Sequence, residues 1–217
     1  MRINVRIPTS LNEVTLGQYQ KYLAIQEMSK DNFTLGTQMI QIFCEVPYAN
    51  LIQFRMSHVN RITQQLGTMF SEDSDKLIRH FEVDNIKYGF IPNLDDMTFG
   101  EYVDLDAYLK DWQDMHKAMS VLYRPIKQKH KERYSIEKYT GENQDVFKKM
   151  PLDVCFSAIV FFYNLANELS RAMLGYLKPQ EREIFQQSVI LGKDGVGISQ
   201  FMHSLKEILQ DTKISLN

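Results

Sequence analysis

The most apolar run of the chain is VCFSAIVFFYNL, residues 154–165. A membrane-spanning helix needs about 20 apolar residues, and this run is shorter and is followed at once by Asn167 and Glu168. Pro151 precedes the run at a position that proline favours, the first turn of a helix. The pattern therefore predicts a helix over residues 152–176. Because this helix is apolar all round, we expect it to be buried at the centre of the fold.

Helical periodicity continues on both sides of this run. Thr15 and Gln18 have the spacing of a capping box, in which each side chain bonds the backbone N–H of the other residue. Apolar residues then recur at helical spacing along the following segments. We expect further helices over residues 16–28, 34–44, 48–54, 57–70, 99–123, 179–187 and 199–209.

Two segments have the pattern of β-strands. Residues 2–7, RINVRI, alternate polar and apolar side chains, and residues 80–91, HFEVDNIKYGFI, resemble a hairpin with a turn at Asp84 and Asn85. A lone hairpin is marginally stable in water, so we expect the N-terminal strand to join it in one small antiparallel sheet. Residues 124–143 are polar and basic, which predicts a surface segment with a short helix near Ser135.

One motif occurs twice. Residues 7–19 are IPTSLNEVTLGQY and residues 91–102 are IPNLDDMTFGEY, and each copy contains a capping box at its threonine. The favoured interpretation is two similar strand-to-helix connections on one sheet. The alternative is a pair of binding loops.

Together these signals predict a mostly α fold of the α+β class. It is a helical bundle around a buried central helix, with a small antiparallel sheet made of the N-terminal strand and hairpin 80–91. A length of 217 residues suits one domain or two small ones. We expect a single domain over residues 1–217, with a possible subdivision into residues 1–78 and 79–217.

Composition limits the class of protein. The chain has 25 Lys and Arg against 27 Asp and Glu, a net charge of −2, which argues against a protein that coats nucleic acid. Cys44 and Cys155 lie among apolar residues and are expected to be reduced core thiols, with a disulfide or a reactive thiol as the alternative. The N-terminus, MRINVRIPTS, lacks the apolar stretch of a signal peptide.

Catalytic signatures are missing from the sequence. No pair of the five histidines has the H-E-x-x-H spacing, and no cysteine cluster accompanies them. The glycine-rich residues 192–197 lack the Gly-Lys-Ser/Thr ending of a phosphate loop, and no G-x-S-x-G motif occurs. His116 is expected to be a partly exposed helical residue. We therefore predict no enzyme activity, no metal site and no cofactor.

Charge is segregated along the middle of the chain. Residues 95–114 contain seven acidic residues and one lysine, which predicts a solvated acidic face, with a divalent-metal site as the alternative. Residues 124–133 contain five basic residues and Glu132. Such a run can bind phosphates, but Tyr123 and Tyr134 only bracket it, so a single-strand binding pattern is not formed. Acid beside base favours docking to another protein or to a second copy of the chain.

The chain also has enough large apolar side chains for a core and an interface. It contains 13 Phe, 11 Tyr and 11 Met, and Tyr and Met are enriched at protein contact surfaces. The candidate partner-binding residues are aromatic, methionine or basic residues from the middle of the chain: Tyr102, Tyr108, Trp112, Met115, Met119, Arg124, Lys127, Lys129 and Lys131.

Four stretches resemble proteins encoded in the structural and tail-assembly genes of tailed bacteriophages. Residues 91–126 and 150–169 are similar to such proteins in general, whereas IPTSLNEVTLGQYQKYL (7–23) and IQIFCEVPYANLIQFRMSHVNRI (40–62) resemble the helical tail-assembly chaperones.

The resemblance implies a non-enzymatic protein that holds or joins other phage proteins. The leading hypothesis is a tail-assembly chaperone in the host cytoplasm that binds a tape-measure or tail protein. A homo-oligomer is a further possibility. The first alternative is a permanent virion component of the neck, tail or baseplate. A nucleic-acid-binding regulator is the third hypothesis.

Overall fold

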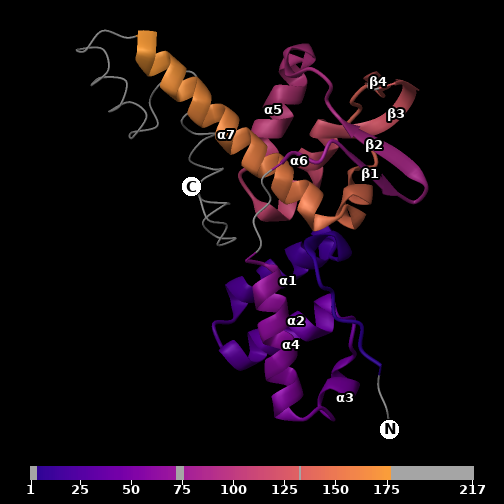
Figure 1. Ribbon diagram of the computed structural model, residues 1–217, viewed down its shortest axis with the longest axis vertical. Helices are drawn as coiled ribbons and strands as arrows, with labels where there is room; N and C mark the ends of the chain where they lie inside the picture. The colour runs from indigo at the N-terminus through magenta and orange to yellow at the C-terminus, as the bar shows by residue number, and fades with distance from the viewer. Residues whose placement is uncertain (1–3, 72–75, 132, 177–217) are drawn as a thin grey trace. The chain divides into compact units, whose positions relative to one another are not determined.

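The computed structural model describes residues 4–71, 76–131 and 133–176 (Figure 1). Within the chain, two compact units are distinguished: residues 1–72 with 78–155, and residues 73–77 with 156–217. The fold is mostly helical and also contains a four-stranded antiparallel sheet, so the α+β class is confirmed. The predicted single domain stays a prediction.

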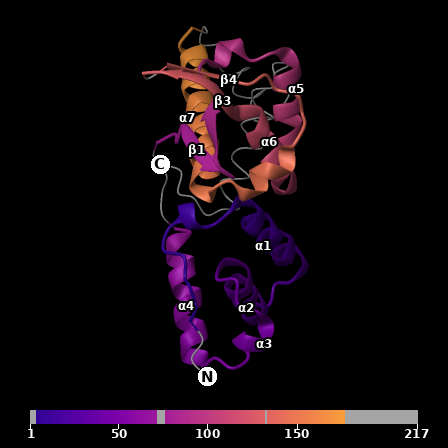
Figure 2. The same ribbon diagram turned by 90° about the vertical axis from the view of Figure 1, so that its right-hand side faces the viewer.

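The first unit begins with a group of helices. They are α1 (Leu16–Met28), α2 (Asn32–Phe43), α3 (Tyr48–Leu51) and α4 (Met56–Met69), after the short 3-10 helix η1 (Leu11–Glu13), and the four predicted helices are confirmed. Helix α2 packs against both α1 and α4 (Figure 2). The capping box of α1 is formed, since Gln18 N donates to Thr15 Oγ1 at 3.2 Å and Thr15 N donates to Gln18 Oε1 at 2.9 Å.

The sheet follows in the chain, and its strands are in sequence order: β1 (His80–Val83), β2 (Ile86–Phe90), β3 (Tyr123–His130) and β4 (Arg133–Ile136). Hairpin 80–91 is confirmed. Its turn residues Asp84 and Asn85 have φ values of 51° and 62°. Two successive left-handed residues are what a type I′ turn requires, and this turn matches the twist of the paired strands.

Two sequence-based expectations about the sheet are wrong. Residues 4–7 form no strand, and the hairpin is instead extended by β3, which pairs with β2. The short helix expected near Ser135 is also absent, because residues 133–136 pair with β3 as strand β4. Lys131, with φ 55°, makes the sharp turn between these two strands.

The single helix expected over residues 99–123 is interrupted. The structure has α5 (Phe99–Tyr108), the 3-10 helix η3 (Trp112–Asp114) and α6 (Met115–Leu122) in this region. Asp111 causes the interruption, since it adopts extended φ and ψ values and its Oδ1 accepts the Gln113 N–H at 2.8 Å. A short polar side chain that caps a new turn competes with helix continuation.

The repeated motif is only partly what the sequence suggested. Both capping boxes are formed, the second with Thr98 N donating to Glu101 Oε2 at 2.7 Å. Only the second copy is a strand-to-helix connection, because β2 precedes it, through the short 3-10 helix η2 (Leu94–Asp96). The first copy follows no strand within the part of the chain described.

Helix α7 (Leu152–Tyr176) has the predicted bounds and follows the 3-10 helix η4 (Gln144–Lys149). Its first turn belongs to the first unit, where Leu152 N donates to Val14 O at 2.9 Å and Pro151 bridges to Thr15. The rest of α7 belongs to the second unit, so its expected place at the centre of a bundle stays a prediction. The helices expected over residues 179–187 and 199–209 lie outside the described residues.

Both cysteines are free thiols in buried positions, as expected. Burial raises the pKa of Cys44 to about 11, and it also raises the pKa of Cys155. Among the described helices, none combines the length and the hydropathy needed to cross a membrane.

Candidate protein-interaction groove

The two faces of the sheet differ in character. On one face, Phe81 stacks on Tyr88 with ring centroids 5.1 Å apart, and Phe147 of η4 packs edge-on against Tyr88. This face is part of the core. On the other face, the aligned residues of β1, β2 and β3 are His80, Gly89 and Arg124. Two hollows of the molecular surface are lined by residues of this second face and the segments around it.

Tyr134 of β4 lies over the second face. Its hydroxyl donates to Phe90 O at 2.6 Å, and its ring contacts the His80 ring edge-on at a centroid distance of 4.6 Å. Gly89 lies beneath the ring, because a Cβ atom added there would be 2.5 Å from Tyr134 Cε2. Burial raises the pKa of Tyr134. Glycine at position 89 is therefore what lets the tyrosine ring cross the sheet.

The larger hollow, of about 900 Å³, lies beside α5 and is called the acidic hollow here. Its walls are residues 91–104 and residues 134–139, with Arg124 between them. Its lining has more acidic than basic side chains: Asp96, Glu101, Asp104 and Glu137 against Arg124 and Lys138. Tyr139 donates a hydrogen bond to Asp104 at 2.9 Å, which ties the chain after β4 to α5.

An ion pair joins the sheet to the base of α5. Arg124 Nη1 is 2.6 Å from Glu101 Oε1, and the two side chains are only 11% and 7% exposed. The other oxygen of Glu101 accepts the Thr98 N–H. One carboxylate thus caps α5 and fixes β3 against it, while its charge is neutralised by the arginine. This pair serves to hold the groove in shape.

Three apolar side chains of α5 are unusually exposed. Phe99 is 81% exposed, Val103 45% and Tyr102 41%, and the spacing i, i+3, i+4 places them on one side of the helix. Phe99 and Val103 also line the acidic hollow. We call Phe99, Tyr102 and Val103 the apolar stripe. Grouped large apolar residues on a surface mark an interaction site more strongly than isolated ones.

The second hollow, of about 640 Å³, is called the basic hollow. Among the described residues, its lining includes four cationic side chains and no carboxylate: Arg79, His80, Pro92, Lys129, Lys131, Arg133 and Tyr134. Within the described part of the chain, none of the four cations takes part in an ion pair. Burial and the nearby Lys129 and Arg79 lower the pKa of His80. This hollow has the chemistry to accept an anionic group.

The two hollows adjoin, because Pro92 and Tyr134 line both of them. We call the combined feature the bipolar groove. Its acidic end lies beside α5 and its basic end at the β3–β4 hairpin, so the charges that are segregated in the sequence are also segregated in space.

The predicted partner-binding residues fall into two groups. Tyr102 is in the apolar stripe, Lys129 and Lys131 line the basic hollow, and Lys127 is exposed at an irregularity of β3 between Ile126 and Gln128. The others lie elsewhere. Tyr108 is half-buried beside Lys117, Arg124 is in the ion pair, and three residues are buried in the core: Trp112, Met115 and Met119.

The groove residues that the sequence-based set lacks include Arg79, His80, Phe99, Arg133 and Tyr134. Phe99 had a usable signal, because the capping box places it at the first helical position, where a side chain is often exposed. Arg133 belongs to the basic run. Arg79, His80 and Tyr134 had no signal in the sequence, because their proximity depends on how the four strands pair in the sheet.

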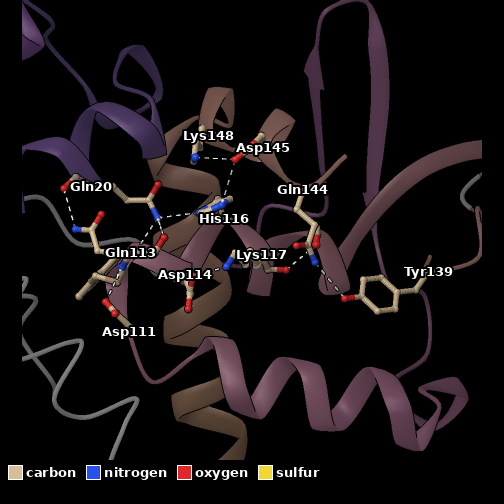
Figure 3. A network of polar contacts seen from close by, with 12 residues as sticks. Gln20, Asp111, Gln113, Asp114, His116, Lys117, Tyr139, Gln144, Asp145 and Lys148 are labelled. Atoms are coloured by element: carbon tan, nitrogen blue, oxygen red, sulfur yellow. Dashed lines mark hydrogen bonds and ion pairs between the residues drawn. The ribbon is translucent and has the colours of Figure 1, made fainter. Parts of the chain in front are cut away.

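A second polar cluster involves His116 (Figure 3). Gln20 Nε2 of α1 donates to Trp112 O at 2.7 Å and lies 3.1 Å from His116 Nδ1, and His116 Nε2 lies 3.5 Å from Asp145 Oδ1. Lys148 also pairs with Asp145, at 2.6 Å. The expectation of a partly exposed His116 is wrong, because this network encloses the ring between α1, α6 and η4.

The cluster around His116 fits a structural role. An Asp–His pair can activate a nucleophile, but the second ring nitrogen here faces the Gln20 amide, which is no nucleophile. Burial lowers the pKa of His116, and the Lys148 charge adds to this effect. A neutral ring with Nδ1 accepting from Gln20 and Nε2–H donating to Asp145 satisfies the geometry.

Across residues 4–71, 76–131 and 133–176, no three His, Cys, Asp or Glu side chains converge as metal ligands would. Several acidic residues of α5 and η3 form ion pairs with basic side chains: Glu101 pairs with Arg124, Asp106 with Lys110, and Asp114 with Lys117.

Comparisons with known proteins add no relative. No protein-family model matches the chain, and no significant match is found among the curated proteins or the solved structures.

Proposed function

We propose that the chain is a non-enzymatic protein-binding protein that holds a segment of a partner polypeptide in the acidic hollow. The observation that carries the proposal is the apolar stripe, with Phe99 81% exposed at the wall of a hollow of about 900 Å³. Covering such side chains removes apolar surface from water, which is the main favourable term in protein association.

The lining of the hollow specifies the chemistry of the partner. Apolar side chains of the segment would cover Phe99 and Val103, and basic side chains would meet Asp96 and Glu137. Charges at the rim contribute to selectivity and to the rate of encounter more than to affinity. The favoured partner segment is therefore apolar with Lys or Arg at its flanks.

The resemblance described for the sequence suggests the biological setting. In that setting the protein is a phage tail-assembly chaperone in the host cytoplasm, and it shields an apolar segment of a tape-measure or tail protein until the tail forms. The alternative is a permanent component of the virion.

Photo-crosslinking tests the binding site directly. Phe99 is replaced by p-benzoylphenylalanine in the full chain, which is expressed during phage infection and irradiated, and the crosslinked peptides are identified by mass spectrometry. Position 33 is the matched control, because Phe33 on α2 is also exposed, at 61%, and does not line the groove. We expect crosslinks from position 99 to converge on one segment of a phage structural protein.

The same experiment can contradict the proposal. Equal and scattered crosslinks from positions 99 and 33 would show that α5 is an ordinary surface. Protein composition of purified particles then separates the two settings, because a virion component is present in fixed stoichiometry and a chaperone is absent.

A further inference from the structure

We propose that the bipolar groove is also the contact surface for a second copy of the chain, related to the first by a twofold axis. In this arrangement, the acidic end of the groove in each copy faces the basic end of the groove in the other. This inference goes beyond the proposed function, since self-association needs no partner protein.

The first argument is charge complementarity within a single chain. The basic hollow presents Lys129, Lys131 and Arg133, all exposed, and Arg79 beside them. The acidic hollow is lined by Asp96 of η2, which is also exposed, and the exposed Asp95 precedes it in the same 3-10 helix. A twofold arrangement uses the same patch on both subunits, so a patch with one acidic and one basic half is complementary to itself.

The second argument is the continuity of the groove. The two hollows meet at Pro92 and Tyr134. An axis near this junction superimposes the acidic half of one copy on the basic half of the other and forms both sets of ion pairs at once. The apolar stripe borders the acidic half, and its burial would add a contribution that does not depend on salt.

The alternative occupant of the basic hollow is a single strand of nucleic acid, for which Tyr134 and His80 would supply aromatic rings. The acidic hollow argues against it. A strand that leaves the basic hollow along the groove meets Asp96 and Glu137, and phosphates are repelled there. A bipolar occupant has no such conflict.

Exposed ion pairs are individually weak and are screened within about 10 Å at 0.1 M salt. The association is therefore expected to depend strongly on ionic strength. Sedimentation equilibrium of the full chain, at about 0.05 M and at about 0.5 M NaCl, measures this dependence. We expect a monomer–dimer equilibrium that shifts toward monomer at the higher salt concentration.

Charge reversal with complementation is the decisive test. One variant carries Lys129→Glu with Lys131→Glu, and the other carries Asp95→Lys with Asp96→Lys. Each alone should weaken self-association by at least about tenfold, because like charges then face each other. An equimolar mixture should regain dimer, because in the mixed dimer both halves of the interface again bring acidic side chains against basic ones. The matched control is Lys21→Glu with Lys30→Glu, two exposed lysines outside the groove, which should leave association unchanged.

Several outcomes overturn the inference. The inference is wrong if the wild-type chain stays monomeric at low salt, or if the reversal variants associate like the wild type. It is also wrong if the mixture stays monomeric while circular dichroism shows intact folds. Salt-sensitive binding of a single-stranded oligonucleotide that is lost in Lys129→Glu with Lys131→Glu would assign the basic hollow to nucleic acid instead. None of these readouts involves a phage partner, so the proposed function is tested separately.

Discussion

At the scale of single residues, Gly89 determines whether the groove can form. The Tyr134 ring lies over it, at the place where the acidic and the basic hollow meet. Neither residue is distinctive in the sequence. Their importance comes from a contact between β2 and a strand two places along the sheet.

Gly89→Ala is expected to destabilise the protein by about 1–3 kcal/mol, because the new methyl group overlaps the Tyr134 ring and forces it to move. Urea denaturation measures the change. Gly67→Ala is the control, since position 67 lies within α4 with nothing within 4 Å, and alanine there should stabilise by about 0.5–1 kcal/mol. Equal effects of the two substitutions would contradict the packing described for Tyr134.

His116 is expected to make stability depend on pH. Its pKa is lowered in the folded state by burial, so the unfolded chain binds a proton more readily. Stability from this group is complete above the unfolded pKa of about 6.5 and is lost as the pH falls below it. The free energy of unfolding should fall between about pH 7.5 and about pH 5.5.

His116→Gln should reduce this pH dependence, because glutamine keeps polar contacts with Gln20 but does not titrate. His80 has a lowered pKa as well and leaves a residual slope. An unchanged slope in the variant would mean that the pKa of His116 is the same in the folded and the unfolded protein.

At the scale of elements, the Arg124–Glu101 pair connects β3 to the start of α5. The two side chains are nearly buried, so the loss of one partner leaves an uncompensated charge. Glu101→Ala also removes the acceptor of the Thr98 N–H. We expect this substitution to cost about 3 kcal/mol or more, and a double-mutant cycle with Arg124→Leu to be strongly non-additive.

Glu101→Gln is the matched control for this cycle. Glutamine at the third helical position keeps the capping box but loses the ionic partner of Arg124. The difference between Glu101→Gln and Glu101→Ala in urea denaturation therefore isolates the cap. Additive single and double variants would show that the two elements are held together by other contacts.

At the scale of the whole molecule, two occupants are proposed for overlapping parts of one groove. The partner segment uses the acidic hollow, and the second copy uses both hollows. Binding of the two therefore competes. The variant Lys129→Glu with Lys131→Glu loses self-association but keeps the apolar stripe and the acidic hollow unchanged.

In this variant, crosslinking from position 99 to the partner segment should increase relative to the same probe in the otherwise wild-type chain, because fewer grooves are covered by a second copy. The ratio of the two crosslink yields measures the competition. A parallel loss of self-association and of partner crosslinks would mean that the basic hollow contributes to partner binding.

Local signals in the sequence were sufficient for many elements. Helices α1 to α4, helix α7 and hairpin 80–91 follow from capping residues, apolar periodicity and a turn pair that accepts left-handed backbone angles. These signals act over a few residues, so they are readable in the chain itself. The acidic and basic stretches of the groove were also recognised as charge clusters.

Long-range packing decided the rest. The hairpin is extended by β3 and not by an N-terminal strand, and Met115 and Met119 became core residues because α6 packs inside the unit. Arg79, just before β1, and Tyr134, in β4, are far apart in the sequence but line the same hollow. Helical and strand periodicity indicates which side of an element is apolar. Which neighbour covers that side depends on the free energy of the complete fold. In this fold Phe99 stays exposed to water, whereas Met119 is buried in the core.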